Sequence, residues 1–376
     1  RQQVASRMLV DGAWHSLPAM TREVGDSILS SLKSLSGLNP ADRRSRQQGM
    51  FNAATEEKKM SLELISQGTK TGERVQLKFI EKRKTDLTLP ELGMWPEMIN
   101  ELSGFMNQPG MVLISAPARS GLTTTWRAGL LAGDRITRDW IAIVDQHDHE
   151  TDVENVVVHQ FNNEKETAES LLRKQILTQP DAVVVPKIES PELLNRLVEE
   201  GSRQERTIVT RANAKSAAEA LLQLHAMAPD KKLFAQTINC VIGQRLARRL
   251  CAKCKTPVRV QPKLIQQLGG DPKKNNTLYN QFRMPPPEQQ VDENGKPIVI
   301  KPCRVCSGIG YIGRISIYEM IKITPEIREA LVKQPKLEVI RKLATKSGDL
   351  TMLQQGYRLA LLGVTSLAEV QRVMKD

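Results

Sequence analysis

Aromatic residues and long apolar runs are both scarce in this chain of 376 residues. Phe, Trp and Tyr make up 4% of it, too few for the stacking platforms that bind single-stranded nucleic acid. No apolar run approaches the ~20 residues that a membrane-spanning helix needs, and no charged-then-apolar signal stands at the start. We therefore expect a soluble, cytoplasmic protein. Because the chain begins at Arg1 rather than at a methionine, we also expect further sequence upstream of it.

Neither sign of charge is concentrated in one region. The chain carries 54 Lys and Arg against 42 Asp and Glu, for a net charge of +12, and its basic residues form only short clusters such as 81–84 and 245–255. A positive balance permits an acidic partner such as nucleic acid or an anionic membrane surface. Because the excess is scattered, we interpret it as an ordinary solvated surface and expect no direct nucleic-acid contact.

Cysteine is rare as well, but four of the five cysteines stand in two pairs. Cys251 and Cys254 form one C-x-x-C knuckle, and Cys303 and Cys306 form the other. Each knuckle places two thiolates on one edge of a tetrahedron, so two of them in a chain without a secretion signal predict a structural zinc site with these four ligands. Free thiols or a redox pair remain the alternative. Cys240 lies in an apolar segment and is predicted to belong to the core.

Residues 110–129 have the plan of a phosphate-binding loop. The apolar run 111–115 predicts a buried strand, residues 116–121 predict a tight loop, and a helix is predicted from Thr123 onward. The free N–H groups at the start of that helix favour an anion at the loop. The same pattern also fits an ordinary strand, turn and helix, so these residues alone do not decide the function.

Two positions of the loop differ from the motif G-x-x-x-x-G-K-[ST]. In that motif the glycines let backbone amides close around phosphates, the lysine reaches the β and γ oxygens, and the hydroxyl holds Mg²⁺. Gly121 and Thr123 stand in place, but Ala116 replaces the first glycine and Leu122 replaces the lysine. We therefore expect the strongest anion contact to be missing, which leaves the amides, the helix dipole and Thr123.

The region before this loop predicts a small α/β domain at residues 1–82, followed by a linker at 83–90. Apolar residues at helical spacing predict a helix at 21–35, and alternating patterns predict strands at 60–66 and 74–80. The linker begins with charged residues and no apolar side chain. We expect it to act as a hinge between two parts that each bury a core.

Residues 91–242 alternate strand and helix patterns, which is typical of a parallel sheet covered by helices. Besides the loop strand, strands are predicted at 141–144, 156–161, 182–185 and 207–210, and helices at 164–177, 191–201 and 216–225. Ligands bind such sheets at the carboxyl ends of strands, where Asp145, Pro186 and Thr210 are expected. The insert between the cysteine pairs is expected to build no core of its own and to form an extended or partly disordered excursion closed by the metal. Helices are predicted from Thr324 onward.

Two segments carry a longer signature. Residues 243–254 read GQRLARRLCAKC, and residues 303–319 read CRVCSGIGYIGRISIYE. They resemble the zinc subdomain of the type II secretion and type IV pilus assembly ATPases of the GspE/PulE/PilB type, whose motifs are GQRLxRxLCxxC and CxxCxxTGYxGRxxIYE. The resemblance covers nearly the whole chain: residues 87–94 resemble the family's linker, 172–185 its LRxxLRQDPDxxxV segment and 348–374 its closing helices.

The resemblance implies an α/β architecture with three further parts after the N-terminal domain and linker. A RecA-like P-loop domain with a parallel sheet is implied at 91–242, a zinc-binding subdomain at 243–318 and a helical C-terminal region at 319–376. It also implies a homo- or hetero-hexamer of secretion-ATPase-type subunits. The implied partners are inner-membrane platform proteins, and the implied location is cytoplasmic and peripheral to the inner membrane.

The chain departs from the family at the nucleotide site. The family's GPTGSGKTTT reads APARSGLTTT, Lys187 stands where the Walker B glutamate belongs, and Asn213 stands where the histidine box has its histidine. The acidic box EDPxE reads DQHDH, from Asp145 to His149. The loop positions that the resemblance assigns to a nucleotide are Ala116, Ser120, Gly121, Leu122, Thr123 and Thr124. In the N-terminal domain it assigns Arg43, Arg44 and Arg74 to the nucleotide of a neighbouring subunit. Lys78 of the same domain stands where the family usually has an arginine.

These losses fall on catalysis, while the metal cysteines and the apolar strands are intact. The pattern favours a pseudo-ATPase: a subunit or adaptor of a type II secretion or pilus-like machine, with structural zinc, weak ATP and Mg²⁺ binding at most, and no working catalytic residues. Two alternatives stay open. One is an active ATPase that powers secretion or pilus assembly, and the other is a zinc-knuckle nucleic-acid binder.

Overall fold

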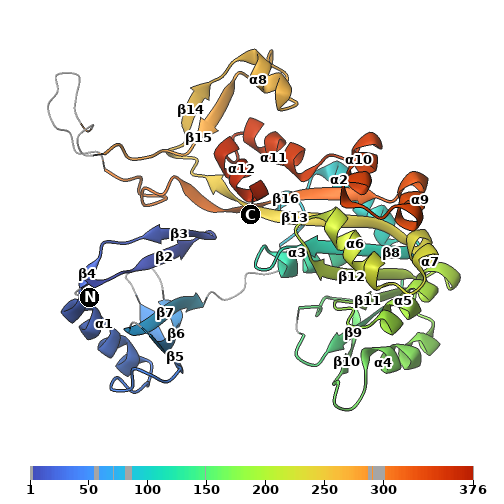
Figure 1. Ribbon diagram of the computed structural model, residues 1–376, viewed down its shortest axis with the longest axis horizontal. Coiled ribbons are helices and arrows are strands. Elements are labelled where there is room, and N and C mark those ends of the chain that lie inside the picture. The colour runs from blue at the N-terminus through green and yellow to red at the C-terminus, as the bar shows by residue number, and fades with distance from the viewer. Residues whose placement is uncertain are drawn as a thin grey trace. The chain divides into compact units, whose positions relative to one another are not determined.

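The protein is represented by a computed structural model that describes residues 3–54, 59–70, 72–80, 87–148, 150–286, 290 and 301–375. Two compact units divide between Thr85 and Asp86 (Figure 1). The division falls within the linker expected at 83–90, of which residues 83–86 lie outside the described part of the chain, as does His149.

The smaller unit is a helix packed against short antiparallel sheets. The helix, α1 (Arg22–Leu35), begins where the hydroxyl of Thr21 accepts the N–H of Val24. Lys33 is buried in α1 and pairs with Glu73, which joins the helix to the sheet β5-β6-β7. The strands of this unit are β1 (Gln3–Val4), β2 (Arg7–Val10), β3 (Ala13–Ser16), β4 (Met20–Thr21), β5 (Gln47–Ala54), β6 (Lys59–Thr69) and β7 (Gly72–Ile80). The predicted helix and two predicted strands are confirmed, whereas β1–β5 were not anticipated.

Among the described residues, a seven-stranded sheet forms the centre of the larger unit, in the order β10-β9-β11-β12-β8-β13-β16 (Figure 1). Neighbouring strands are parallel except β13 and β16, which are antiparallel. The strands are β8 (Gly110–Ala116), β9 (Trp140–Asp145), β10 (Val157–Phe161), β11 (Ala182–Val185), β12 (Thr207–Asn213), β13 (Ile238–Leu250) and β16 (Tyr311–Lys322). The predicted parallel sheet is therefore confirmed, and the antiparallel edge strand β16 was not anticipated.

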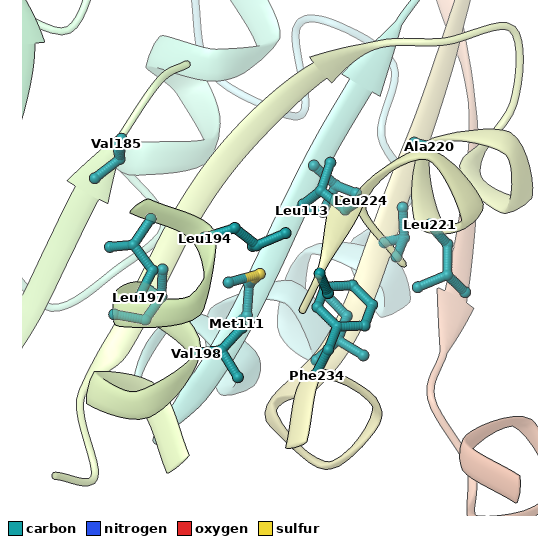
Figure 2. Packing of buried hydrophobic residues seen from close by; sticks show 14 of the residues in the cluster. Met111, Leu113, Val185, Leu194, Leu197, Val198, Ala220, Leu221, Leu224 and Phe234 are labelled. Atoms are coloured by element: carbon teal, nitrogen blue, oxygen red, sulfur yellow. The ribbon is translucent and has the colours of Figure 1, made fainter. Parts of the chain in front are cut away.

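Helices cover both faces of this sheet. Met111 and Leu113 of β8 face one apolar cluster, and Val112 and Ile114 face the other, so the strand is apolar on both sides as a central parallel strand must be. Residues of α5, α6 and α7 pack around Met111 and Leu113 (Figure 2). The helices of the first face are α4 (Ala168–Gln175), η1 (Ile176–Thr178), α5 (Pro191–Arg203), α6 (Ala217–Met227), α7 (Lys231–Thr237), α9 (Pro325–Lys333) and α10 (Leu337–Lys346), and those of the second are α2 (Pro96–Met106) and α3 (Leu122–Leu130).

The insert between the cysteine pairs has a core, so the expectation of an extended excursion was wrong for its first half. It contains β14 (Thr256–Arg259), α8 (Pro262–Gln267) and β15 (Thr277–Asn280). Ile265, Leu268 and Leu278 are buried, and they pack with Tyr357 and Leu361 of α11 (Met352–Leu361). The apolar residues of the insert are too few to bury one another. The C-terminal helix α11 supplies the other side of this core.

The cysteine segments extend directly from the main sheet. Cys251 follows the last residue of β13, and Cys306 lies shortly before β16 begins at Tyr311. The boundaries expected at residues 243 and 319 therefore fall inside strands of the sheet. The helical C-terminal region is confirmed and closes with α12 (Leu367–Lys375) after α9, α10 and α11.

Candidate functional site

Four neighbouring strands end at one edge of the sheet, where α/β proteins bind ligands. In the order β9-β11-β12-β8, these strands end at Asp145, Val185, Asn213 and Ala116. A cleft of about 770 Å³ lies beside the loop and strand ends. The candidate residues that line it are Gly121, Leu122, Thr123, Thr124, Lys187 and Asn213. Parts of four sequence motifs are thus brought together by the parallel sheet.

The loop after β8 folds as a tight turn that leads into a helix. Arg119 and Gly121 both have left-handed backbone, with φ of 62° and 83°, and α3 begins at the next residue, Leu122. The side chain of Gln244 on β13 donates a hydrogen bond of 2.7 Å to the carbonyl of Ser120. A side chain at Gly121 would approach that amide nitrogen to 3.0 Å, so the turn has little room there. Gln244 was not expected at this site, although it lies in the GQRL segment.

Leu122 brings no charge to the lysine position. Its partly buried side chain packs against the apolar cluster that contains Trp126 and Ile114. Thr123 and Thr124 line the cleft at the start of α3, whose free N–H groups favour an anion. Ala116 and Ser120, although expected at a nucleotide, do not line the cleft: Ala116 is fully buried in the sheet.

Lys187 occupies the Walker B position as part of an ion pair. Its ammonium lies 2.5 Å from a carboxylate oxygen of Glu189, and its side chain is 79% exposed. The hydrogen bond to Glu189 and the charge of Glu189 raise the pKa of Lys187, and Asp145 adds to the effect. The family motif GEIRD has an acid and then a base at these two positions. This chain has the same pair with the signs reversed.

Arg211 forms an ion network at the same edge of the cleft. It is the first residue of the histidine-box segment, and its guanidinium pairs with Asp148 at 3.2 Å and with Glu150. The guanidinium also lies 5.3 Å from the ring centroid of Trp126 on α3. The side chains of Arg211 and Asp148 are each 15% exposed. The residues after β9 are therefore tied to β12 and α3 by a shielded charge network. Arg211 could have been found from the sequence, because a charged residue stands where the motif TLHTN has threonine.

The remaining nucleotide candidates are dispersed. Asp145 ends β9, where its carboxylate accepts the N–H of His147 at 2.9 Å, but it does not line the cleft. Asn213 lines the cleft and is exposed. Arg43 and Arg74 belong to the smaller unit, in which Arg43 pairs with Asp26 at 3.4 Å. His149 lies outside the described residues.

The four paired cysteines meet in one cluster. The sulfurs of Cys251, Cys254, Cys303 and Cys306 all lie within 4.8 Å of one another. The Cys251 to Cys303 distance is 3.9 Å and the Cys254 to Cys306 distance is 3.6 Å, too long for a disulfide and close to the edge of a tetrahedron with metal–sulfur bonds of ~2.3 Å. The residues present therefore fit a tetrahedral thiolate site for one metal ion.

Backbone N–H groups of the second knuckle point at its sulfurs and stabilise the thiolate of Cys303. The N–H of Gly310 donates to the sulfur of Cys306 at 3.2 Å. The backbone N–H groups of Cys306 and Val305 lower the pKa of Cys303 to about 7. Gly308 and Gly310 have φ of 82° and 79°, which lets the knuckle turn tightly enough to present these amides. A cation bound by the four sulfurs would be held by charged ligands with oriented donors behind them.

Fold and site together define a P-loop-type α/β protein with an attached four-cysteine cluster. A family model described as "Type II/IV secretion system protein" matches residues 2–372, so the chain belongs to that family. The resemblance inferred from the cysteine segments and the motif pattern is confirmed.

Curated relatives match nearly the whole of this chain. It is 28% identical to the type IV pilus assembly ATPase PilB of Acinetobacter baylyi over 98% of this chain and 61% of that protein. It is 27% identical to the type II secretion system protein E of Pectobacterium carotovorum over 98% of this chain and 70% of that protein. The chain thus spans less than two thirds of the PilB relative's length.

Solved structures agree on the fold. The ATPase DotB of Legionella pneumophila matches with a TM-score of 0.55 at 12% identity, over 100% of this chain and 91% of that one. The pilus retraction motor PilT with bound ADP matches with a TM-score of 0.53 at 14% identity, over 100% and 92%. Within the described residues, no helix has the length and apolar character to cross a membrane.

Proposed function

We propose that the protein is a catalytically impaired subunit or adaptor of a type II secretion or pilus-like machine. The observation that carries this proposal is the packing of Leu122 into the apolar cluster beneath the loop. In a phosphate-binding loop a lysine from this position reaches the β and γ phosphates. Here no cation can replace it from the same backbone position, because the side chain is apolar and partly buried.

A second feature supports the loss of chemistry. Lys187 has its positive charge where the family's glutamate acts on the attacking water, and its ammonium is held by Glu189. A protonated amine has no lone pair, so it can neither take a proton from the attacking water nor orient that water by accepting a hydrogen bond from it. Asn213 replaces the histidine of the histidine box as well. Binding and hydrolysis are thus weakened by separate substitutions.

The four-cysteine cluster supports a structural metal, which we propose to be zinc. Zn²⁺ prefers four tetrahedral thiolates in closed structural sites, and the sulfur separations match that arrangement. Cys251, Cys254, Cys303 and Cys306 would hold it. The ion would supply charge compensation for the thiolates and would fix the end of β13 to the segment that leads into β16.

Assembly and location follow from the family as part of the same proposal. The chain would form a hexamer with copies of itself or with related subunits, and would act at inner-membrane platform proteins from the cytoplasmic side. Arg43 and Arg74 would then approach the nucleotide cleft of a neighbouring subunit, as the resemblance implies.

Phosphate release from Mg²⁺-ATP tests the proposal directly. The purified protein is expected to release phosphate at the background rate, while the type IV pilus assembly ATPase PilB of A. baylyi serves as the positive control in the same assay. Phosphate release by the unmodified protein that disappears in Thr123→Ala would establish the alternative, an active ATPase. Salt-dependent binding of DNA or RNA, with no effect of membrane-platform proteins, would favour the nucleic-acid binder instead.

A further inference from the structure

Cations surround the cleft although the loop lysine is missing. Of the described lining residues, Arg119, Lys187, Arg211 and Arg314 are basic and only Glu150 is acidic. Such an excess of positive charge beside a helix N-terminus attracts anions, and a concave site strengthens the field. The absence of one lysine therefore does not leave the cleft without anion-binding groups.

These four cations differ in what they can offer a ligand. Lys187 is paired with Glu189, and Arg211 is paired with Asp148 and Glu150. In the described part of the chain, neither Arg119 nor Arg314 has an ion-pair or hydrogen-bond partner for its guanidinium, and both side chains are exposed. Each keeps a planar fork of donors that matches two phosphate oxygens. Arg119 and Arg314 are thus the groups ready to receive an anion.

The conformation of Arg119 adds to this argument. Its φ of 62° lies in the left-handed region, where a non-glycine residue has a strained backbone. The family's loop, GPTGSGKT, has glycine at this position. This chain therefore places a long cationic side chain, in place of hydrogen, on a turn that faces the cleft.

Two carboxylates beside the cleft, Asp148 and Glu150, already have a cationic partner. Mg²⁺ at phosphate sites is bound by one or two carboxylates together with phosphate oxygens and water. Asp148 and Glu150 are bound by Arg211, and the charge of Asp145 acts on Lys187. A divalent cation entering here would meet two resident cations, Lys187 and Arg211, and would compete with Arg211 for Asp148 and Glu150.

We infer that the cleft binds the phosphate chain of a nucleotide or polyphosphate without a divalent metal, through Arg119 and Arg314. This inference deepens the proposed function, on which it rests, by naming the ligand class of the same cleft and the residues that hold it. Arginine takes the part of both the loop lysine and the metal. The phosphates are neutralised for binding, but no metal is positioned to activate a leaving oxygen.

Calorimetric titration of ATP into the whole protein tests the inference. Binding is expected in EDTA, with an affinity within about twofold of that in Mg²⁺, and it should weaken as NaCl is raised because the contacts are between charges. Arg119→Asn removes the cation but suits the left-handed backbone, so the loop keeps its shape. It is expected to weaken binding about tenfold, the size of one charge-assisted contact, as is Arg314→Ala. Arg119→Lys should restore part of the affinity.

Arg173→Ala is the matched control, because Arg173 is an exposed arginine of α4 outside the cleft. It should bind ATP as the unmodified protein does. Inorganic tripolyphosphate and adenosine, used as competitors in EDTA, separate the two sources of phosphate. Competition by tripolyphosphate alone means that the phosphate chain is recognised, and additional competition by adenosine means that the nucleoside contributes.

The result that overturns the inference is distinct from the one that overturns the proposed function. Three results would refute metal-independent anion binding even if hydrolysis stays absent. These are ATP binding that requires Mg²⁺, ATP binding that Arg119→Asn and Arg314→Ala leave unchanged, and no binding of ATP or tripolyphosphate at all. Phosphate release from Mg²⁺-ATP would refute the proposed function.

Discussion

The carboxylate of Glu319 on β16 accepts a hydrogen bond of 2.7 Å from the backbone N–H of Ala217, the first residue of α6. Its other oxygen accepts the N–H of Met352, the first residue of α11, at 3.3 Å. One side chain thus satisfies the starts of two helices that are far apart in sequence. Negative charge is also favoured at helix N-termini by the helix dipole.

Glu319→Gln should therefore lower the free energy of unfolding by about 1–2 kcal/mol, because one acceptor oxygen becomes an N–H₂ donor that faces a backbone donor. Urea unfolding followed by circular dichroism measures the change. Glu329→Gln is the control, since Glu329 is an exposed residue paired with Lys333 on α9, and it should change stability by less than ~0.5 kcal/mol. Equal effects of the two substitutions would contradict the role assigned to Glu319.

Glu369 predicts a pH dependence of stability. It is 1% exposed on α12 and its carboxylate accepts hydrogen bonds from Arg372 and Arg248. Burial alone would raise the pKa of Glu369, but these hydrogen bonds outweigh it and lower the pKa to about 2 from the usual 4.5. A folded-state pKa below the unfolded value means that this contribution is complete above about pH 5 and is lost as the pH falls toward 2.

Glu369→Gln is expected to cost roughly 3 kcal/mol near neutral pH, and the gap between variant and unmodified protein should close as the pH falls below about 4. Urea unfolding at a series of pH values measures the gap, and the difference between the two proteins removes the effect of other titrating groups. A gap that stays constant from neutral pH to pH 3 would show that the ionised carboxylate does not supply this stability.

The cysteine cluster predicts one zinc per chain. Elemental analysis of the purified protein should give a molar ratio near one, and Cys303→Ser should lower it, because a hydroxyl is a far weaker zinc ligand than a thiolate. The same variant should be cut faster by protease between Lys255 and Pro302, since the metal would close that segment. Cys240→Ala is the control: Cys240 is buried in the sheet core, away from the cluster, and the variant should keep its zinc. A zinc content well below one in the unmodified protein would count against the metal site.

Repair of the nucleotide site should require several substitutions together. Leu122→Lys is expected to strengthen Mg²⁺-ATP binding about tenfold by adding a cation at the phosphates, without turnover. Lys187→Glu and Asn213→His added to it should raise phosphate release above background, because binding and chemistry are then both restored. The control adds Thr123→Ala to the triple variant and should abolish the gain. Turnover from Leu122→Lys alone would mean that Lys187 does not block the chemistry.

The sequence predicted the layers of the larger unit because its signals are local and strong there. The apolar run at 111–115 and the strand at 182–185 are buried on both sides, so their composition alone distinguishes them from surface segments. Thr324 followed by Pro325 marked the start of α9 correctly, since capping depends on neighbours in sequence. The short strands β1–β4 were missed because each has only two to four residues, too few for a strand pattern to stand out in the sequence.

The sequence by itself determined which chemical groups are present: four thiols at metal spacing, a leucine in place of a lysine, and a lysine in place of a glutamate. Only the tertiary structure decided what surrounds them. Register and strand order bring Arg211 of β12 to Asp148 and Glu150 after β9, and these residues lie about 60 positions apart in the chain. The same long-range packing lets α11 complete the core of the insert and lets Glu319 cap two helices. Pairings of this kind depend on how the chain returns to itself, and the spacing of residues along the sequence does not contain that information.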